Sequence, residues 1–199
     1  MPRAGLTPAI VVDRAAELAD EVGYDGLTLA LVAARLGVAV PSLYKHVDGL
    51  DALRRGVAIQ AVAELGEALR VSLDEGFATD PSARLRTLAS AFRGYAKAHP
   101  GRYAATVRAA PPGDAEHARA SDAVLATVLE VLAEQGLTGP AAIDATRALR
   151  ATLHGFVTLE AAGGFGLPRE VDRSFEVAVE ALERGLSTIP DRSFPEEGA

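Results

Sequence analysis

The sequence lacks cysteine, and it lacks any apolar run approaching the roughly 18 to 20 uncharged residues that a membrane-spanning helix needs. The missing cysteines exclude disulfides and thiolate metal sites, and they favour a reducing compartment. The first residues also lack the basic segment and apolar stretch of a secretion signal. We therefore expect a soluble, cytoplasmic protein with no membrane partner.

Signatures of catalysis are missing as well. The four histidines, at positions 46, 99, 117 and 154, show no metal-binding spacing, and there is no cysteine nucleophile. The glycine-rich stretch AAGGFG closes a helical pattern and does not follow a strand, so it is not a phosphate-binding loop. We expect no enzyme activity, no metal and no cofactor. An all-helical enzyme or small-molecule carrier that has lost DNA binding is kept as an alternative.

The residues that are present favour helices. Alanine, leucine, glutamate and arginine dominate, and 49% of the chain is hydrophobic. Threonines stand as N-caps before periodic apolar stretches at Thr7 and Thr28, and glycines end these stretches at Gly23 and Gly37. We predict an all-α protein of about nine helices. The predicted domains are a three-helix head at residues 1–55 with a connecting helix to about 75, a bundle at 80–190, and a loose tail at 191–199.

Charge is divided unevenly along the chain. The formal net charge is -7, but six basic and seven acidic residues leave residues 1–55 at -1, so the rest carries -6. Local charge, and not the total, decides where a polyanion binds. Any contact with a nucleic acid is therefore expected at the N-terminal end.

Residues 29–48 have the spacing of a helix-turn-helix. Two helices that cross steeply need a small residue at the crossing, which Ala33 provides. The tight turn needs a positive φ, which Gly37 allows four residues later. The residues expected to hold the pair together from inside are apolar: Val32, Leu36, Val38 and Leu43.

The second helix of this pair, predicted over about residues 40–46, would enter the major groove of DNA. Its hydroxyls suit phosphates or bases, its lysine and histidine suit phosphates or guanine, and its valine and proline suit a thymine methyl. Another reading makes Tyr44 a half-buried core residue and Lys45 a solvated charge. The residues assigned to DNA are Thr28, Val40, Pro41, Ser42, Tyr44, Lys45 and His46.

The stretch GYDGLTLALVAARLGVAVPSLYKHVDGLDALRRGVA resembles the DNA-binding head of the TetR/AcrR family of transcriptional regulators. Further on, LRATLHGFVTLEAAGGFG resembles the ligand-binding domain of one branch of that family, in which a Trp-His-Gly triplet is usual. Leu153 stands at the tryptophan position, and His154 and Gly155 match. A second departure is Leu50, where family members usually carry a phosphate-binding lysine. Either of the two arginines at positions 54 and 55 is a candidate to replace it partly.

The resemblance implies a four-helix dimer interface formed by the last two helices of each chain. Apolar stripes on these helices agree with it, although the same stripes would also suit the core of a single chain. The residues assigned to the dimer interface are Leu149, Leu153, Leu159, Phe175, Val179, Leu182 and Leu186. The aromatic residues and histidines assigned to an effector pocket are Phe92, Tyr95, His99, Tyr103, His154 and Phe156.

These observations predict a homodimeric repressor that a small, largely apolar effector releases from a palindromic DNA operator. An activator that uses the same head is an alternative. The sequence names neither the effector nor the operator.

Overall fold

The computed structural model describes residues 5–76 and 80–189, and within these ranges the chain forms nine α-helices and no strand. This confirms the predicted all-α class. The predicted loose tail at 191–199 lies outside the described residues. The helices are α1 (Pro8–Val22), α2 (Leu29–Leu36), α3 (Val40–Leu43), α4 (Gly49–Glu75), α5 (Pro81–Ala98), α6 (Pro100–Ala105), α7 (Ala115–Glu134), α8 (Gly139–Ala161) and α9 (Val171–Leu186).

The chain divides into two compact units, and the division is not the one that the order of helices suggests. Unit 1 contains residues 1–67 and 98–124, whereas unit 2 contains residues 68–97 and 125–199. Both α4 and α7 therefore contribute to both units, and α6 belongs with the head. The predicted boundaries of 1–55 and 80–190 stay a prediction about the functional domains.

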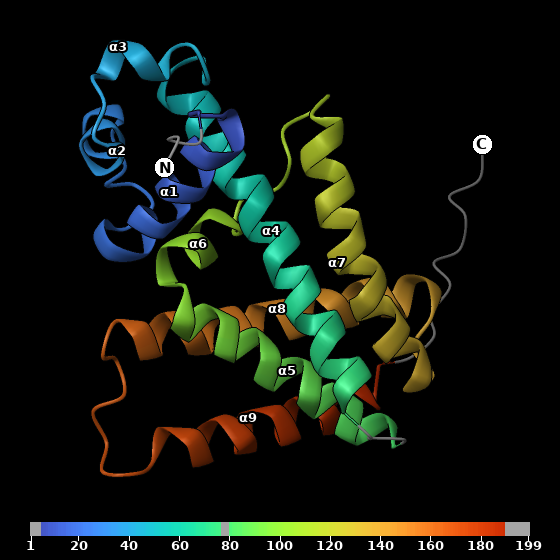
Figure 1. The fold of residues 1–199 in the computed structure, drawn as a ribbon. Coiled ribbons are helices and arrows are strands. Elements are labelled where there is room, and N and C mark those ends of the chain that lie inside the picture. Colours follow the sequence, from blue (N-terminus) through green and yellow to red (C-terminus); the bar gives the residue numbers. More distant parts are fainter. Residues whose placement is uncertain (1–4, 77–79, 190–199) are drawn as a thin grey trace, which may run out of the picture. The chain divides into compact units, whose positions relative to one another are not determined.

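Unit 1 is built on a small apolar core. Figure 1 shows α1, α2 and α3 gathered around the first turns of α4, with α6 against α1. The side chains that α1 turns inward, Val11, Ala15 and Leu18, pack with Leu53 and Val57 of α4 in one cluster. The short helices are thus stabilised by burial against α1 and α4, because isolated helices of this length are unstable in water.

Unit 2 contains α5, α8 and α9 with the later parts of α4 and α7. Its helices turn leucines, alanines and aromatic residues inward, and α8 and α9 are in direct contact. A cluster of charged and aromatic residues ties three of its helices together. The guanidinium of Arg93 on α5 binds Glu160 at the end of α8 and Asp172 at the start of α9.

The same guanidinium lies over the rings of Phe156 and Phe175, at 5.6 and 4.7 Å from their centroids. Phe156 also packs against Phe165 in the loop between α8 and α9. The ion pair lowers the pKa of Glu160 to about 2, chiefly through the hydrogen bonds from Arg93. This cluster holds the α8–α9 loop in place.

Candidate nucleic-acid interface

The turn between α2 and α3 has the geometry that the spacing predicts. Gly37 lies in the left-handed region at φ 67° and ψ 32°. Its N–H donates to the carbonyl of Ala34 at 3.1 Å, and the N–H of Val38 donates to the carbonyl of Ala33 at 3.0 Å. These bonds close the C-terminus of α2 in a way that only a glycine allows without strain.

The residues predicted to pin the pair from inside do so. Val32, Ala33 and Leu43 are at most 2% exposed, and Leu36 and Val38 pack against the same core while partly buried. Ala33 is therefore buried in the core of unit 1, as a small residue at a close crossing would be. The helix-turn-helix is confirmed as a structural unit.

The recognition element differs from the prediction in one respect. Helix α3 ends at Leu43, whereas the sequence predicted a helix to about residue 46. The N–H groups of His46 and Val47 both donate to the carbonyl of Leu43, so residues 44–46 continue as tight turns. Tyr44, Lys45 and His46 thus extend from the end of a one-turn helix.

Several outward side chains of the recognition element are exposed and have no hydrogen-bond or ion-pair partner in the described part of the chain. Tyr44 is 56% exposed, so more than half of its surface is open to a partner. Pro41 and Lys45 are exposed, whereas Ser42 and His46 are partly buried. Within the described part of the chain, no side-chain hydrogen bond or ion pair engages Tyr44, Lys45 or His46. Val40, the remaining residue assigned to DNA on this element, packs partly against the core of unit 1.

Thr28 caps α2 and remains exposed. Its hydroxyl oxygen accepts a hydrogen bond from the N–H of Leu31 at 3.2 Å, so the N-terminus of α2 begins at a defined place. The hydroxyl is still free to donate its own hydrogen to an acceptor such as a phosphate.

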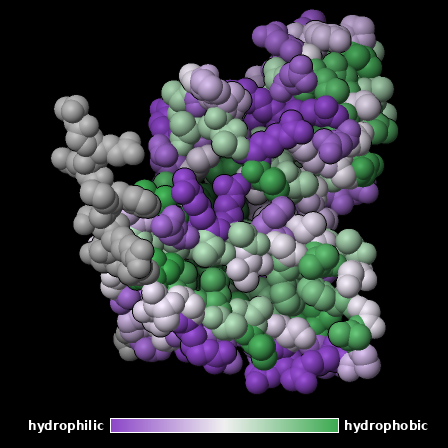
Figure 2. All heavy atoms as spheres, turned by 180° about the vertical axis from the view of Figure 1, so that it is seen from behind, coloured by the Kyte–Doolittle hydropathy of each residue, from purple (hydrophilic) through white to green (hydrophobic). Residues whose placement is uncertain are grey.

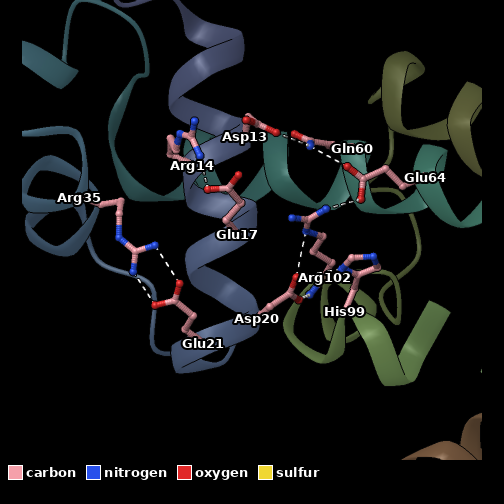
Figure 3. Close-up of polar contacts among 10 residues, drawn as sticks. All are labelled: Asp13, Arg14, Glu17, Asp20, Glu21, Arg35, Gln60, Glu64, His99 and Arg102. Atoms are coloured by element: carbon pink, nitrogen blue, oxygen red, sulfur yellow. Dashed lines mark hydrogen bonds and ion pairs between the residues drawn. The ribbon is translucent and has the colours of Figure 1, made fainter. Parts of the chain in front are cut away.

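Most of the cations near this element are neutralised within the chain. Figure 3 shows Arg14 bound to Glu17 and Arg35 bound to Glu21. Arg55 binds both Asp114 and Glu116 at the start of α7, at 2.6 and 3.0 Å. Its hydrogen bonds lower the pKa of Asp114 to about 2 and raise the pKa of Arg55 itself. Arg55 is therefore already paired with two carboxylates, and its role as a replacement for the phosphate-binding lysine stays a prediction.

Helix α6 is held against α1 by hydrogen bonds and ion pairs that the sequence did not predict. The N–H of Arg102 donates to a carboxylate oxygen of Asp20 at 2.9 Å, and its guanidinium bridges Asp20 and Glu64 at 3.1 Å each (Figure 3). His99, which was assigned to the effector pocket, lies with Nδ1 3.3 Å from the same Asp20. The pairing joins residues about 80 positions apart, and no local pattern signals it.

The six residues assigned to an effector pocket are divided between the units. Phe92, Tyr95, His154 and Phe156 belong to unit 2, whereas His99 and Tyr103 belong to unit 1. The aromatic residues Phe92, Tyr95 and Tyr103 are buried. Phe156 takes part in the Arg93 cluster. The pocket as a whole stays a prediction.

Five residues assigned to the dimer interface are buried in the single chain. Leu149, Leu153, Phe175, Val179 and Leu186 are at most 5% exposed, so they fill the interior of the chain, as the alternative interpretation had it. Leu182 is partly buried, and Leu159 is 51% exposed. The large apolar side chains that unit 2 exposes near these stripes are Ile143, Leu159, Leu167 and Val177.

The described residues carry neither a metal-binding group nor a membrane-spanning helix. Across residues 5–76 and 80–189, no group of three or more histidine or acidic side chains is arranged to hold a metal ion. No described helix combines the length and apolarity needed to cross a membrane.

Comparison with known proteins agrees with this geometry. Residues 11–55 match the family described as bacterial regulatory proteins, tetR family, and residues 85–182 match the tetracyclin repressor-like C-terminal domain. The chain is 35% identical over 186 residues to YobS, an HTH-type transcriptional regulator of Bacillus subtilis (strain 168), covering 93% of this chain and 95% of YobS. The chain belongs to the TetR family of transcriptional regulators.

Solved structures of TetR-like fold superpose on most of the chain. A protein from Rhodococcus sp. RHA1 has a TM-score of 0.78 at 26% identity, covering 94% of this chain and 98% of that one. A TetR variant from Acinetobacter baumannii AYE, in complex with minocycline, has a TM-score of 0.68 at 26% identity, covering 91% and 96%.

Membership of the TetR family assigns the two matched ranges. The helix-turn-helix of residues 11–55 is the DNA-binding part, and residues 85–182 form the C-terminal ligand-binding domain. TetR proteins are transcription regulators and not enzymes, so the enzyme alternative is set aside. The match to the C-terminal domain begins within α5, and it includes residues of both compact units.

Proposed function

We propose that this TetR-family protein is a homodimeric repressor, which a small and largely apolar effector releases from a palindromic operator. DNA binding by the helix-turn-helix is the family's common property, whereas the dimer, the effector class and the direction of regulation are proposals.

The observation that carries the proposal is the uncommitted surface of the recognition element. Tyr44 and Lys45 are exposed and have no partner among the described residues, while the arginines at positions 14, 35 and 55 are bound to carboxylates. A hydroxyl and an ammonium group on two consecutive exposed residues after α3 suit a phosphate or a base edge.

A dimer is supported by the need for two heads and by the surface of unit 2. Helix-turn-helix proteins read half-sites about 34 to 36 Å apart with a symmetric pair of heads. Figure 2 shows green and white residues over much of the face in its lower half, with purple residues along one edge. Ile143, Leu159, Leu167 and Val177 supply exposed apolar side chains on α8, α9 and their loop.

The effector class is supported by the apolar character of the ligand-binding domain. Phe92 and Tyr95 are buried on α5, and the TetR variant from Acinetobacter baumannii AYE, which has a similar fold, was solved in complex with the small molecule minocycline. An effector that binds the DNA-incompatible arrangement more tightly than the DNA-bound one would shift the population away from the operator.

Selection from random duplexes followed by gel shift tests the proposal. The full chain should retard a palindromic duplex, and the double variant Tyr44→Ala, Lys45→Ala should weaken binding by roughly tenfold or more, since each lost contact is worth about 1 kcal/mol or above. Arg147→Ala on α8, whose side chain is 78% exposed, is the matched control and should bind as the wild type does.

Two outcomes contradict the proposal. If the gel shows no retarded band at low salt, the protein does not bind DNA. If the double variant binds as tightly as the wild type, a surface other than the recognition element contacts the DNA. A reporter assay in a deletion strain decides the direction of regulation: target expression rises on deletion of a repressor, and it falls on deletion of an activator.

A further inference from the structure

Leu50 leaves the start of α4 without the cation that TetR proteins usually place there. Leu50 is a partly exposed apolar residue at the second position of α4. Phosphate contacts fix the register of a DNA-binding protein, and a cation close to this point would replace the contact that Leu50 cannot make. The described lysines and arginines of residues 5–67 are five: Arg14, Arg35, Lys45, Arg54 and Arg55.

Arg54 differs from the other arginines of this set in what its guanidinium binds. Its Nη2 donates to the carbonyl of Asp25 at 2.8 Å and to the carbonyl of Leu27 at 3.2 Å. Both acceptors are neutral, and no described carboxylate forms an ion pair with it. The other three arginines are bound to glutamate or aspartate, so Arg54 alone among them keeps an uncompensated positive charge.

The site of that charge is set by the α1–α2 turn. Leu27 is fully buried and directly precedes Thr28, the N-cap of α2. The hydroxyl of Tyr24 donates to the carbonyl of Arg54 at 3.1 Å, so the turn and the second turn of α4 hold each other from both sides. The guanidinium is thereby fixed beside the start of the helix-turn-helix.

The guanidinium of Arg54 keeps N–H donors that could bind a phosphate. Both hydrogen bonds of the guanidinium leave from Nη2, and the N–H groups of Nη1 have no partner in the described part of the chain. Arg54 is partly exposed, and it lies four residues after Leu50, on the same side of α4. A guanidinium suits phosphate better than a lysine does where its orientation is already fixed.

We propose that Arg54 contacts the DNA backbone and takes the place of the lysine that Leu50 replaces. The inference rests on the proposed DNA-bound state, and it assigns one further residue to that interface. A competing role is purely structural, in which Arg54 only joins α4 to the α1–α2 turn.

The salt dependence of binding separates the two roles. Each phosphate contact lowers the slope of log K against log salt concentration by about 0.9, whereas a structural latch leaves the slope unchanged. The probe is the duplex that the wild-type chain selects, and fluorescence anisotropy gives the affinity at a series of salt concentrations.

Arg54→Gln removes the charge, and because its amide is two bonds shorter than Nη2 it also weakens the bonds to the carbonyls of Asp25 and Leu27. We expect weaker binding to every duplex alike and a slope smaller in magnitude by about 0.9 for each chain in the complex. Arg54→Lys should keep the wild-type slope. Arg55→Gln is the matched control, because it removes an equal charge from the adjacent position, and its slope should also be that of the wild type.

Adding Leu50→Lys to the Arg54→Gln variant tests replacement directly, and it should restore the lost slope. If Arg54→Gln keeps the wild-type slope of log K against log salt concentration but has a lower affinity and a lower Tm, the proposal is overturned and the role of Arg54 is purely structural. Equal slope losses in Arg54→Gln and Arg55→Gln would overturn it in favour of a general charge effect. A wild-type chain that binds no duplex at low salt would instead refute the proposed function itself.

Discussion

At the scale of single residues, two glycines of unit 1 allow backbone arrangements that a side chain would prevent. Gly37 supplies the left-handed turn of the helix-turn-helix, and its φ of 67° was predictable because a tight turn between two helices needs it. Gly101 has another purpose, which the sequence did not reveal. A Cβ at this position would lie 1.8 Å from the carbonyl oxygen of Ala19, so α6 touches the backbone of α1.

Gly101→Ala is therefore expected to separate α6 from α1. The clash is with backbone and cannot be relieved by a rotamer change, so we expect the free energy of unfolding to fall by about 3 kcal/mol. Urea denaturation followed by circular dichroism measures it. Gly94→Ala in α5 is the control: no atom lies within 4 Å of its added Cβ, and it should raise stability by about 0.5 to 1 kcal/mol. Equal stability of the Gly101→Ala variant would mean that α6 does not approach α1 this closely.

The apolar periodicity of the helices predicts which side chains are buried, but it does not predict what covers them. Leu43 was predicted to be buried and Tyr44 to point outward, and their exposed fractions are 0% and 56%; the contact of Tyr44 with DNA stays a prediction. Leu149 and Phe175 were assigned to a dimer but lie inside the chain. An apolar stripe indicates that a helix face is covered, and it does not indicate whether the cover is the same chain or a second copy.

At the scale of elements, the ends of helices were predictable where a side chain caps them. Thr7 accepts a hydrogen bond from the N–H of Ile10, and Thr28 accepts one from Leu31, as the pattern of threonine before an apolar stretch predicts. The end of α3 was not predictable. A helix of one turn has no period to read, and its extent is set by the packing of Leu43 and the bonds to its carbonyl.

The α8–α9 loop is held by charge, and its stability should depend on pH. The pKa of Glu160 falls from 4.5 to about 2 in the folded chain because Arg93 and Lys97 donate to it. A lowered folded-state pKa stabilises the fold at pH values above 4.5, and this contribution disappears as the pH falls toward 2. Glu160→Gln should thus lower the free energy of unfolding by about 2 kcal/mol near neutral pH, and the difference from the wild type should shrink in acid.

Urea denaturation at a series of pH values checks this expectation. Glu176→Gln is a suitable control, because Glu176 pairs with Arg173 on the surface of α9 and its loss should change stability little at any pH. If the loss of unfolding free energy in Glu160→Gln stayed constant from neutral to acid pH, the ion pair with Arg93 would not be its cause.

At the scale of the whole chain, the order of helices was predictable and their grouping was not. Lengths and caps indicated a head, a connector and a bundle, yet α6 and the first half of α7 belong to the compact unit that contains the head. The cause is a set of contacts distant in sequence, from Arg102 to Asp20 and from Arg55 to Asp114. No composition or spacing rule pairs residues so far apart.

Exposed apolar side chains on α8 and α9 bear on the oligomeric state of the chain. Leu159 on α8 and Val177 on α9 are 51% and 41% exposed, and apolar side chains of this size on adjacent helices suit an interface between copies. The wild type should behave in light scattering as a particle of twice the 20.6 kDa chain mass. The double variant Leu159→Glu, Val177→Glu should be monomeric, because a symmetric interface would bury both carboxylates of each chain without partners.

Val107→Glu provides the comparison for this experiment, since Val107 is 40% exposed but lies outside α8 and α9. It should leave the mass and the DNA affinity unchanged. The monomeric variant should keep its helical content and its weak binding to a single half-site, and it should lose the tighter binding to the full palindrome, because two linked heads raise the effective concentration of the second contact. A wild type of 20.6 kDa, or a double variant that still dimerises, would show that α8 and α9 do not form the interface.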